Sequence, residues 1–386
     1  TQYRAQNGVP RSLYGIAGMG AAITPLGTDS TVLRTCTGEF RFDTFNNLNA
    51  PGWSSLMRVL QEGYLSVDFF FILSGFVVHY GYGERLRMQV VSSSKFLLYR
   101  AAHLYPLYFI CILVSIPLYY GGWGALPRML ASPDFFVHLL MLQTFVPQEN
   151  YAFQFNALGW AVSVEFFFYF CYLYINNVSI RKLNFLCALL WFVLIFFATV
   201  KGLAIRNYAW FYYICPVSRL TEFLLGVVLY GVYIKLRPLV SRWGLVQKTI
   251  IEFGGCCFLL LSIVIAIIFD FGWEYKWSIY YALPCAVFIL SFSFDAGCIS
   301  RLLSSRFVQY LGKISFPLYL VHQLCLAVSK FSFVSLFPRG NYLLSDVLIC
   351  SLFGLLLSIA VAIIAFHVIC RPTNIFLRRL VDKFVQ

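Results

Sequence analysis

Long apolar runs separated by short polar connections dominate this chain. About ten of them approach the roughly 20 residues that an α-helix needs to cross a bilayer. These predicted spans are 12–28, 64–82, 96–119, 157–176, 183–200, 213–234, 249–270, 277–294, 307–329 and 343–370. The first is the weakest, because glycines and Pro25 interrupt it. Another apolar stretch, Phe135 to Val146, is too short to span, so we expect it in the membrane interface.

The pattern predicts an all-α polytopic membrane protein, with about ten transmembrane helices around an interior polar cavity. No segment is typical of a soluble domain, so residues 1–386 are expected to form a single transmembrane domain. The longest connections, 29–63 and 120–156, are long enough to cover a binding site. We find no internal repeat of the kind that inverted-repeat transporters contain.

Composition agrees with this class. Hydrophobic residues make up 60% of the chain and charged residues 12%, whereas soluble proteins are about a quarter charged. Lipid solvates so much apolar surface directly, which makes membrane lipid the first expected partner. Tyr and Trp are expected at the two interfaces, where an amphipathic ring suits the headgroup level.

The formal net charge of +13 is informative through the distribution of the Lys and Arg residues along the chain. No basic low-complexity arm is present, so we do not expect a nucleic-acid partner. If the N-terminus is placed inside, more of the 29 Lys and Arg residues fall in inside segments than in outside loops. The positive-inside rule therefore predicts that both termini are cytosolic.

The 12 cysteines form neither a CxxC pair nor a His/Cys spacing typical of metal ligands. Most lie in apolar runs, where cysteine behaves as a small hydrophobic residue. We therefore expect neither a metal site nor a disulfide framework.

Ionisable side chains inside the apolar runs carry the strongest functional signal. A charge at membrane depth costs several kcal/mol, so such a group normally faces a polar cavity and marks a functional pathway. The candidates are Asp68, Arg100, Glu165, Arg219 and His322.

Arg100 and His103 are three residues apart and share a helical face, and Pro106 follows one turn later. Near the cytosolic side, Arg100 would grip phosphates through its planar fork of donors. The alternative interpretation is an arginine that extends to the lipid headgroups.

The other candidates also have two interpretations. Glu165 would be a general base, or would pair with an arginine to hold two helices together. Arg219 would bind substrate, or would pair with Glu222 along its own helix. Asp68 would face the cavity, or would be an interfacial residue or helix cap. His322 would be catalytic, or would form a hydrogen bond between helices.

Taken in order, five segments resemble acyltransferase family 3, a family of integral membrane proteins. They are Val67 to Phe76, which matches VDxFFxLSGF; Arg100 with Tyr105 to Tyr108; Trp160 with Ser163, Val164 and Glu165; Arg219 with Phe223 and Gly226; and Gly312 with Ser315, Tyr319 and His322. The resemblance covers about residues 10 to 370 and implies a ten-helix layout, in agreement with the predicted spans.

The resemblance implies transfer of an acyl group, usually acetyl, from cytosolic acyl-CoA to a hydroxyl of a glycan or small lipophilic acceptor. Acyl-CoA is a donor substrate here, and no permanently bound cofactor is expected. A base would take the acceptor proton, and arginines would hold phosphates or the developing oxyanion. The expected catalytic residues are Glu165 and His322, and the expected substrate-binding residues are Arg100, His103, Arg219, Trp160, Asp68, Ser163 and Tyr319.

The chain departs from the family pattern in its first span and its third. Ala17 stands where the family has Arg, and Gly27 or Thr28 stands where it has a His treated as catalytic. His103 replaces a second Arg in the third span. Three explanations remain open: an inactivated or engineered form, a pseudo-enzyme that still binds donor, or a relocated base at His322, Glu165 or His103. We favour an enzyme; the alternative is a pseudo-acyltransferase or a lipid or small-molecule transporter.

Overall fold

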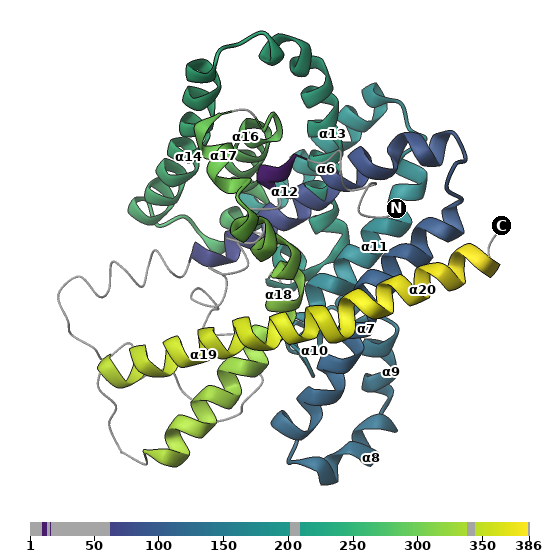
Figure 1. The fold of residues 1–386 in the computed structure, drawn as a ribbon, viewed down its shortest axis with the longest axis vertical. Coiled ribbons are helices and arrows are strands. Elements are labelled where there is room, and N and C mark those ends of the chain that lie inside the picture. The colour runs from purple at the N-terminus through teal and green to yellow at the C-terminus, as the bar shows by residue number, and fades with distance from the viewer. Residues whose placement is uncertain are drawn as a thin grey trace.

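The computed structural model describes residues 10–13, 16, 62–200, 209–295, 297–337 and 344–384. Within these ranges every regular element is a helix (Figure 1). The all-helical class predicted from the apolar runs is therefore confirmed for this part of the chain. The predicted first span, 12–28, lies almost entirely outside the described residues, and so do Ala17, Gly27 and Thr28.

Seven helices of the described part are long and apolar enough to cross a membrane. They contain α6 (Leu65–Arg87), α7 (Ser93–Tyr119), α12 (Ile180–Thr199), α13 (Pro216–Ser241), α14 (Leu245–Ile268), α18 (Arg306–Leu336) and α19 (Leu344–Ala365). A 3-10 turn, η1 (Glu62–Tyr64), leads into α6, and a π-turn, η4 (Trp210–Ile214), precedes α13. Each of the seven coincides with a predicted span.

Two further predicted spans contain shorter apolar helices, α11 (Gly159–Ile175) and α16 (Ala282–Ser293). At the usual rise of about 1.5 Å per residue, neither reaches across a hydrocarbon core of about 30 Å. Before α16 the chain passes through α15 (Trp273–Tyr275) and η5 (Lys276–Tyr280), where Ser278 has a φ of 61°. The count of ten transmembrane helices therefore stays a prediction.

The connection between α7 and α11 folds into short helices. These are η2 (Trp123–Ala125), α8 (Leu126–Leu130), α9 (Pro133–Leu139), η3 (Gln143–Phe145) and α10 (Glu149–Ala152). Phe135 is buried while Phe136 and Leu140 are exposed, as expected for a segment with one side on the protein and one toward lipid. A sixth short helix, α17 (Cys298–Leu303), joins α16 to α18.

His138 in α9 is a buried polar group outside the spanning helices. Burial lowers the pKa of its imidazole, although a hydrogen bond from Nδ1 to the Asp134 carbonyl oxygen, 2.8 Å away, opposes that shift. The Tyr108 hydroxyl in turn donates to the His138 carbonyl oxygen over 2.7 Å. This bond ties the connection to α7.

Helices α6 and α13 cross in direct backbone contact. A Cβ added at Gly75 would lie 2.0 Å from the Phe223 carbonyl oxygen, and one at Gly226 would lie 2.0 Å from the Ile72 carbonyl oxygen. Only glycine fits at either position, because no other residue lacks a Cβ. Small residues that let two helices approach closely are a common packing device in membranes. This contact fixes the position of α6 relative to α13.

Helix α19 runs into α20 (Arg371–Phe384) through the π-turn η6 (Phe366–Cys370). The three elements form one continuous helix, drawn in yellow across the front of Figure 1. Helix α19 packs against α18, and α20 packs along α7. The C-terminal segment is therefore part of the helical body.

Candidate active site

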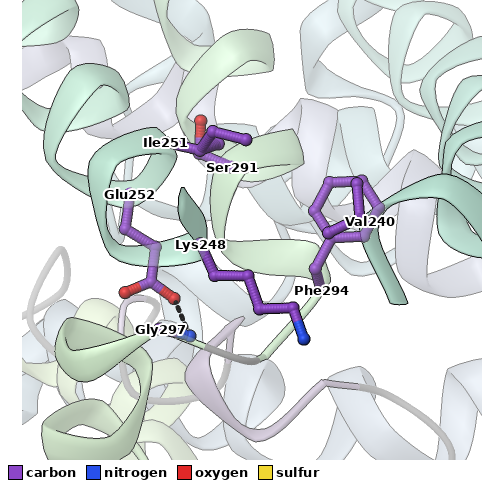
Figure 2. Close-up of a pocket in the computed structure, with 7 residues that line it drawn as sticks. All are labelled: Val240, Lys248, Ile251, Glu252, Ser291, Phe294 and Gly297. Carbon is purple, nitrogen blue, oxygen red and sulfur yellow. Dashed lines mark hydrogen bonds between the residues drawn. The ribbon is translucent and has the colours of Figure 1, made fainter. Parts of the chain in front are cut away.

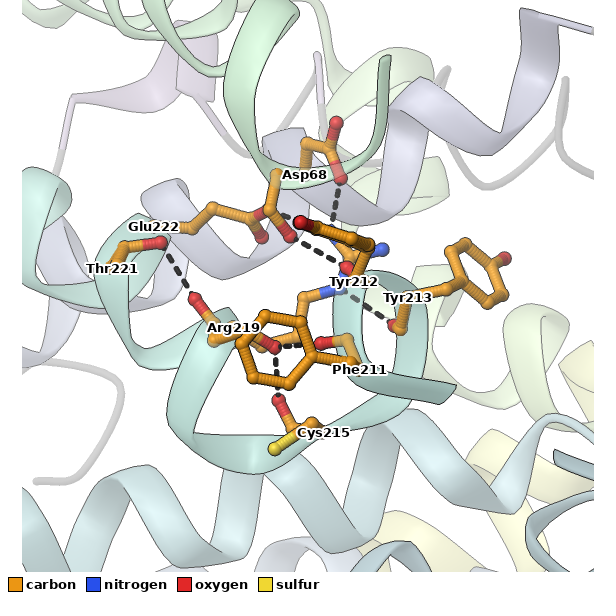
Figure 3. Close-up of polar contacts among 10 residues, drawn as sticks. Asp68, Phe211, Tyr212, Tyr213, Cys215, Arg219, Thr221 and Glu222 are labelled. Carbon is orange, nitrogen blue, oxygen red and sulfur yellow. Dashed lines mark hydrogen bonds and ion pairs between the residues drawn. The ribbon is translucent and has the colours of Figure 1, made fainter. Parts of the chain in front are cut away.

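The centre of the described structure is an ionic group that we call the Arg219 cluster: Asp68, Arg219 and Glu222. Arg219 Nη1 lies 2.5 Å from Asp68 Oδ1 and 2.6 Å from Glu222 Oε1. All three side chains are fully buried, and Figure 3 shows the guanidinium between the two carboxylates. The pair at i, i+3 on α13 is present as predicted, but Asp68 of α6 is a second acidic partner. Arg219 therefore joins two helices.

A non-helical residue between η4 and α13 positions Arg219. Cys215 has a non-helical backbone conformation, with φ −56° and ψ 123°, and Pro216 occupies the first turn of the helix. This interruption leaves the Tyr213 carbonyl oxygen free to accept a hydrogen bond from Arg219 Nε over 2.7 Å. The local sequence thus builds a third polar contact for the guanidinium.

Aromatic rings surround the same guanidinium. Its Cζ atom lies 5.0 Å from the ring centroid of Tyr213, 5.7 Å from that of Trp160 and 5.8 Å from that of Phe71. Trp160 and Tyr213 also contact each other, with ring centroids 4.8 Å apart. Trp160, predicted to bind substrate, therefore lies against Arg219.

Three polar atoms of the Arg219 cluster have no hydrogen-bond partner among the described residues: Asp68 Oδ2, Arg219 Nη2 and Glu222 Oε2. One guanidinium faces two carboxyl groups. Buried polar atoms in a folded protein are normally hydrogen-bonded, so orphans of this kind call for an explanation. A bound ligand that completes the hydrogen bonds is one such explanation.

Helix α18 contributes His322, whose orientation indicates a tautomer. Its Nδ1 lies 2.8 Å from the Tyr319 carbonyl oxygen and 3.2 Å from that of Leu318. Because a carbonyl only accepts, Nδ1 carries the proton, and the neutral ring then holds its lone pair on Nε2. Nε2 is buried and has no partner in the described part of the chain. This is the arrangement that a general base requires.

Tyr319 connects His322 to the other candidates. Its ring centroid lies 6.1 Å from that of His322, and the side chain is close enough to interact with the charges of Arg219 and Glu165. The Tyr319 hydroxyl and the amide Nε2 of Gln323 are also buried without a partner in the described ranges. Several unsatisfied groups from α6, α13 and α18 therefore belong to one neighbourhood.

Glu165 on α11 is already occupied by hydrogen bonds. Its Oε1 accepts from the Ser74 hydroxyl at 3.0 Å and from the hydroxyl of Tyr169, one helical turn away. Tyr169 in turn lies beneath Arg100, whose Cζ is 4.8 Å from the ring centroid. Of the two predicted catalytic residues, His322 has a fully buried nitrogen without a partner among the described residues, whereas two hydroxyls already donate to one carboxylate oxygen of Glu165.

The structure separates Arg100 and His103 from the Arg219 cluster. Arg100 also stacks on Tyr82, which lies about 20 Å along α6 from Asp68 at the usual helical rise. His103 Nδ1 lies 3.3 Å from Asn374 Nδ2 of α20, and its ring stacks on Phe316. These two predicted substrate-binding residues therefore belong to a different part of the molecule.

Ser163 has a local structural environment. Its hydroxyl lies 2.8 Å from the Thr144 hydroxyl and donates to the Met141 carbonyl oxygen over 2.6 Å. Both contacts attach α11 to the connection that precedes it. The predicted role of Ser163 in substrate binding stays a prediction.

Sequence reasoning missed a second buried ion pair. Lys276 Nζ lies 2.7 Å from Glu62 Oε1, and the Tyr64 and Tyr281 hydroxyls each donate to Glu62 Oε2 over 2.6 Å. Glu62 and Lys276 looked like loop residues, since each lies just outside a predicted span. Their pairing fixes the start of α6 to the start of α16.

A depression of about 190 Å³ lies beside the first turns of α14 (Figure 2). Its lining residues are Val240, Lys248, Ile251, Glu252, Ser291, Phe294 and Gly297. The Glu252 carboxylate accepts backbone hydrogen bonds from Gly297 at 2.8 Å and Ile299 at 3.0 Å, so it caps the start of α17. Because this carboxylate is already used, the depression is structural. The predicted interior polar cavity stays a prediction.

The described residues contain no group of three or more His, Cys, Asp or Glu side chains placed to hold a metal ion.

Comparison with known families gives one match over most of the chain. The acyltransferase 3 family, described as an acyltransferase domain, matches residues 40–367. Helix α20 lies beyond the matched segment. No solved structure gives a significant match.

Two curated proteins are similar to parts of the chain. Acyltransferase MdmB of Streptomyces mycarofaciens is 27% identical over 192 residues, which cover 46% of this chain and 48% of MdmB. Protein 2 in the picA locus of Rhizobium radiobacter is 47% identical over 51 residues, which cover 13% of this chain and 27% of that protein. The chain thus spans about half or less of the length of each relative.

Proposed function

Since this chain belongs to the acyltransferase 3 family and is a multi-pass membrane protein, we propose that it transfers an acyl group, in the first instance acetyl, from acyl-CoA to a hydroxyl-bearing acceptor. The observation that supports this proposal best is the unoccupied Nε2 of His322. A fixed imidazole with its lone pair on the free nitrogen is suited to take a proton from a hydroxyl.

The reaction balances without a metal. His322 Nε2 takes the proton of the acceptor hydroxyl as its oxygen attacks the thioester carbonyl carbon. A C–O bond forms, and the collapse of the tetrahedral intermediate breaks the C–S bond. The CoA thiolate then receives the proton from the imidazolium, which restores His322. The products are the ester and free CoA.

The surrounding groups suit the charges that develop. Arg219 Nη2 and the Tyr319 hydroxyl are buried donors without a partner in the described structure, so they are the candidates to stabilise the oxyanion. The two carboxylates of the Arg219 cluster would hold the guanidinium in place and favour an imidazolium nearby. Trp160 would form an aromatic wall of the site, and Asp68 would contribute through Arg219.

This assignment makes His322 a relocated base. The positions where the family has its first-span Arg and His are Ala17 and Gly27 or Thr28, which lie outside the described residues. Glu165 is the weaker candidate, because Ser74 and Tyr169 already donate to its Oε1.

The test is release of free thiol from acetyl-CoA by the purified protein, with CoA binding followed in parallel. His322→Gln should lower the turnover number by about 100-fold or more, in the range of general-base loss, and leave CoA binding unchanged. His367→Gln is the control, because the His367 ring in η6 is partnered by the Tyr310 hydroxyl of α18 and touches none of the candidate residues.

Thiol release retained in His322→Gln but lost in Glu165→Gln would move the base to Glu165. If the wild-type protein binds CoA without releasing thiol, it is a pseudo-acyltransferase. If it neither binds CoA nor releases thiol, the transporter alternative replaces the proposal.

A further inference from the structure

Helix α20 presents an unpaired cation to the predicted donor side of the protein. Arg378 Nε is buried and has no hydrogen-bond partner among the described residues, and none of their carboxylates lies within ion-pair distance of its guanidinium. The guanidinium instead rests on an aromatic ring, with Cζ 4.9 Å from the centroid of Tyr99 on α7. Arg378 as a whole is partly buried, and no anion among the described residues satisfies its buried Nε.

The neighbours of Arg378 add further donors and positive charge. His103 lies close enough to Arg378 and to Arg100 to interact with the charge of each. Its Nδ1 faces the Asn374 amide nitrogen at 3.3 Å, so a neutral His103 carries its proton on Nε2 as an additional donor. We call Tyr99, His103, Asn374 and Arg378 the α7–α20 contact.

One acid lies nearby but does not cancel these charges. Asp382 lies one helical turn after Arg378 on α20 and accepts a hydrogen bond from the Tyr99 hydroxyl. No described carboxylate, Asp382 included, lies within ion-pair distance of the Arg378 guanidinium. Helix α20 as a whole carries four basic side chains and one acidic one.

We infer that the α7–α20 contact binds a phosphoryl group, with Arg378 as its cation, His103 as a further donor and the neighbouring Arg100 as a second cation. Arginine forms charge-assisted, often bidentate hydrogen bonds with phosphate. The inference rests on the proposed function for one source of that group, the nucleotide phosphates of acyl-CoA. A phospholipid headgroup offers the same chemistry. Arg378 and Asn374 lie beyond residue 367, so family membership alone does not imply their role.

The experiment compares Arg378→Gln with Arg379→Gln in the purified full chain. Both changes remove one positive charge from α20, but Arg379 is exposed and Arg378 is partly buried. Binding is measured for coenzyme A and for pantetheine, which lacks phosphates. Thermal stabilisation is measured in phosphatidylcholine nanodiscs with and without phosphatidylglycerol.

Arg378→Gln should weaken coenzyme A binding by about tenfold or more, since one charge-assisted hydrogen bond to phosphate is worth roughly that much. It should not change pantetheine binding, and it should raise the KM for acetyl-CoA while leaving kcat similar. Arg378→Lys should give an intermediate result, because it keeps the charge and loses the planar fork. Arg379→Gln should have less than about a twofold effect.

The coenzyme A and phosphatidylglycerol measurements distinguish the two sources of the phosphoryl group. If Arg378→Gln loses only the stabilisation by phosphatidylglycerol, the phosphoryl group comes from a lipid. If it matches Arg379→Gln for both ligands, the inference is overturned. Coenzyme A binding that depends on Arg378 in a protein without thiol release would retain this site and reject the proposed function. Thiol release without any Arg378 dependence would do the opposite.

Discussion

Two arginines, both held between helices, have opposite surroundings. Arg219 lies between two carboxylates, with a carbonyl oxygen on its Nε, and joins α6 to α13. Arg378 rests on a tyrosine ring between α7 and α20, and its buried Nε has no partner in the described structure. Two acidic partners hold the Arg219 guanidinium in place between two helices, whereas no acid among the described residues pairs with Arg378. The same residue type therefore predicts different roles in the two places.

The largest expected effect is on stability and comes from removing Arg219. Arg219→Met would leave Asp68 and Glu222 buried together without a cation. Breaking a buried ion pair on one side costs about 3–5 kcal/mol. The loss of stability is measured by thermal unfolding in detergent, together with the yield of monodisperse protein.

A triple substitution sharpens this test. Asp68→Asn and Glu222→Gln added to Arg219→Met remove the uncompensated charges and should recover part of the lost stability. If Arg219→Met is as stable as the wild type, the Arg219 cluster does not support the fold.

The next effect concerns the helix crossing that carries the Arg219 cluster. Gly226→Ala would place a Cβ 2.0 Å from the Ile72 carbonyl oxygen, so α6 and α13 would have to separate. Overpacking of this kind costs about 1–3 kcal/mol. The control is Gly81→Ala on α6, where no atom lies within 4 Å of the added Cβ. Gly81→Ala should be neutral or slightly stabilising in the same unfolding assay.

Arg378→Met should lower stability by only about 0.5–1 kcal/mol, the value of an exposed cation–π contact. The substitution keeps much of the aliphatic stem and removes the charge. Thermal unfolding in the absence of ligand measures this change in stability. A loss as large as that of Arg219→Met would remove the distinction between the two arginines.

The smallest expected effect is a pH dependence of the stability, and it comes from His138, a buried residue that lies near neither arginine. Burial lowers the pKa of His138 in the folded protein, so below about pH 6.5 the unfolded chain binds more protons than the folded one. Stability should therefore fall as the pH decreases through this range. The measurement is the wild-type unfolding temperature from pH 8 to pH 5 minus that of His138→Gln. An identical pH dependence in both proteins would show that His138 is not the cause.

The sequence predicted the helical class, nine of the described helices and the family, because apolar runs and motif order are local properties. It also predicted the Arg219–Glu222 pair, which lies within one helical turn. The interpretation of Asp68 as an interfacial residue or helix cap was wrong, since the side chain is fully buried against Arg219.

Long-range pairings could not be predicted in the same way. Glu62 of η1 pairs with Lys276 of η5, more than 200 residues later, and Asn374 of α20 contacts His103 of α7. Nothing in either local pattern specifies such a partner. The preference for His322 over Glu165 also required the structure, because it depends on which atoms are already hydrogen-bonded.

The continuous helix formed by α19, η6 and α20 has a mechanical consequence. At the usual helical rise it is about 60 Å long, twice the thickness of the hydrocarbon core. A rod of this length would act as a lever: a ligand that drew α20 closer to α7 would apply a torque to α19, which packs on α18, the helix that carries His322. The π-turn η6 is the natural pivot of that lever. Binding of the donor at the α7–α20 contact would thereby shift the position of His322, the proposed base.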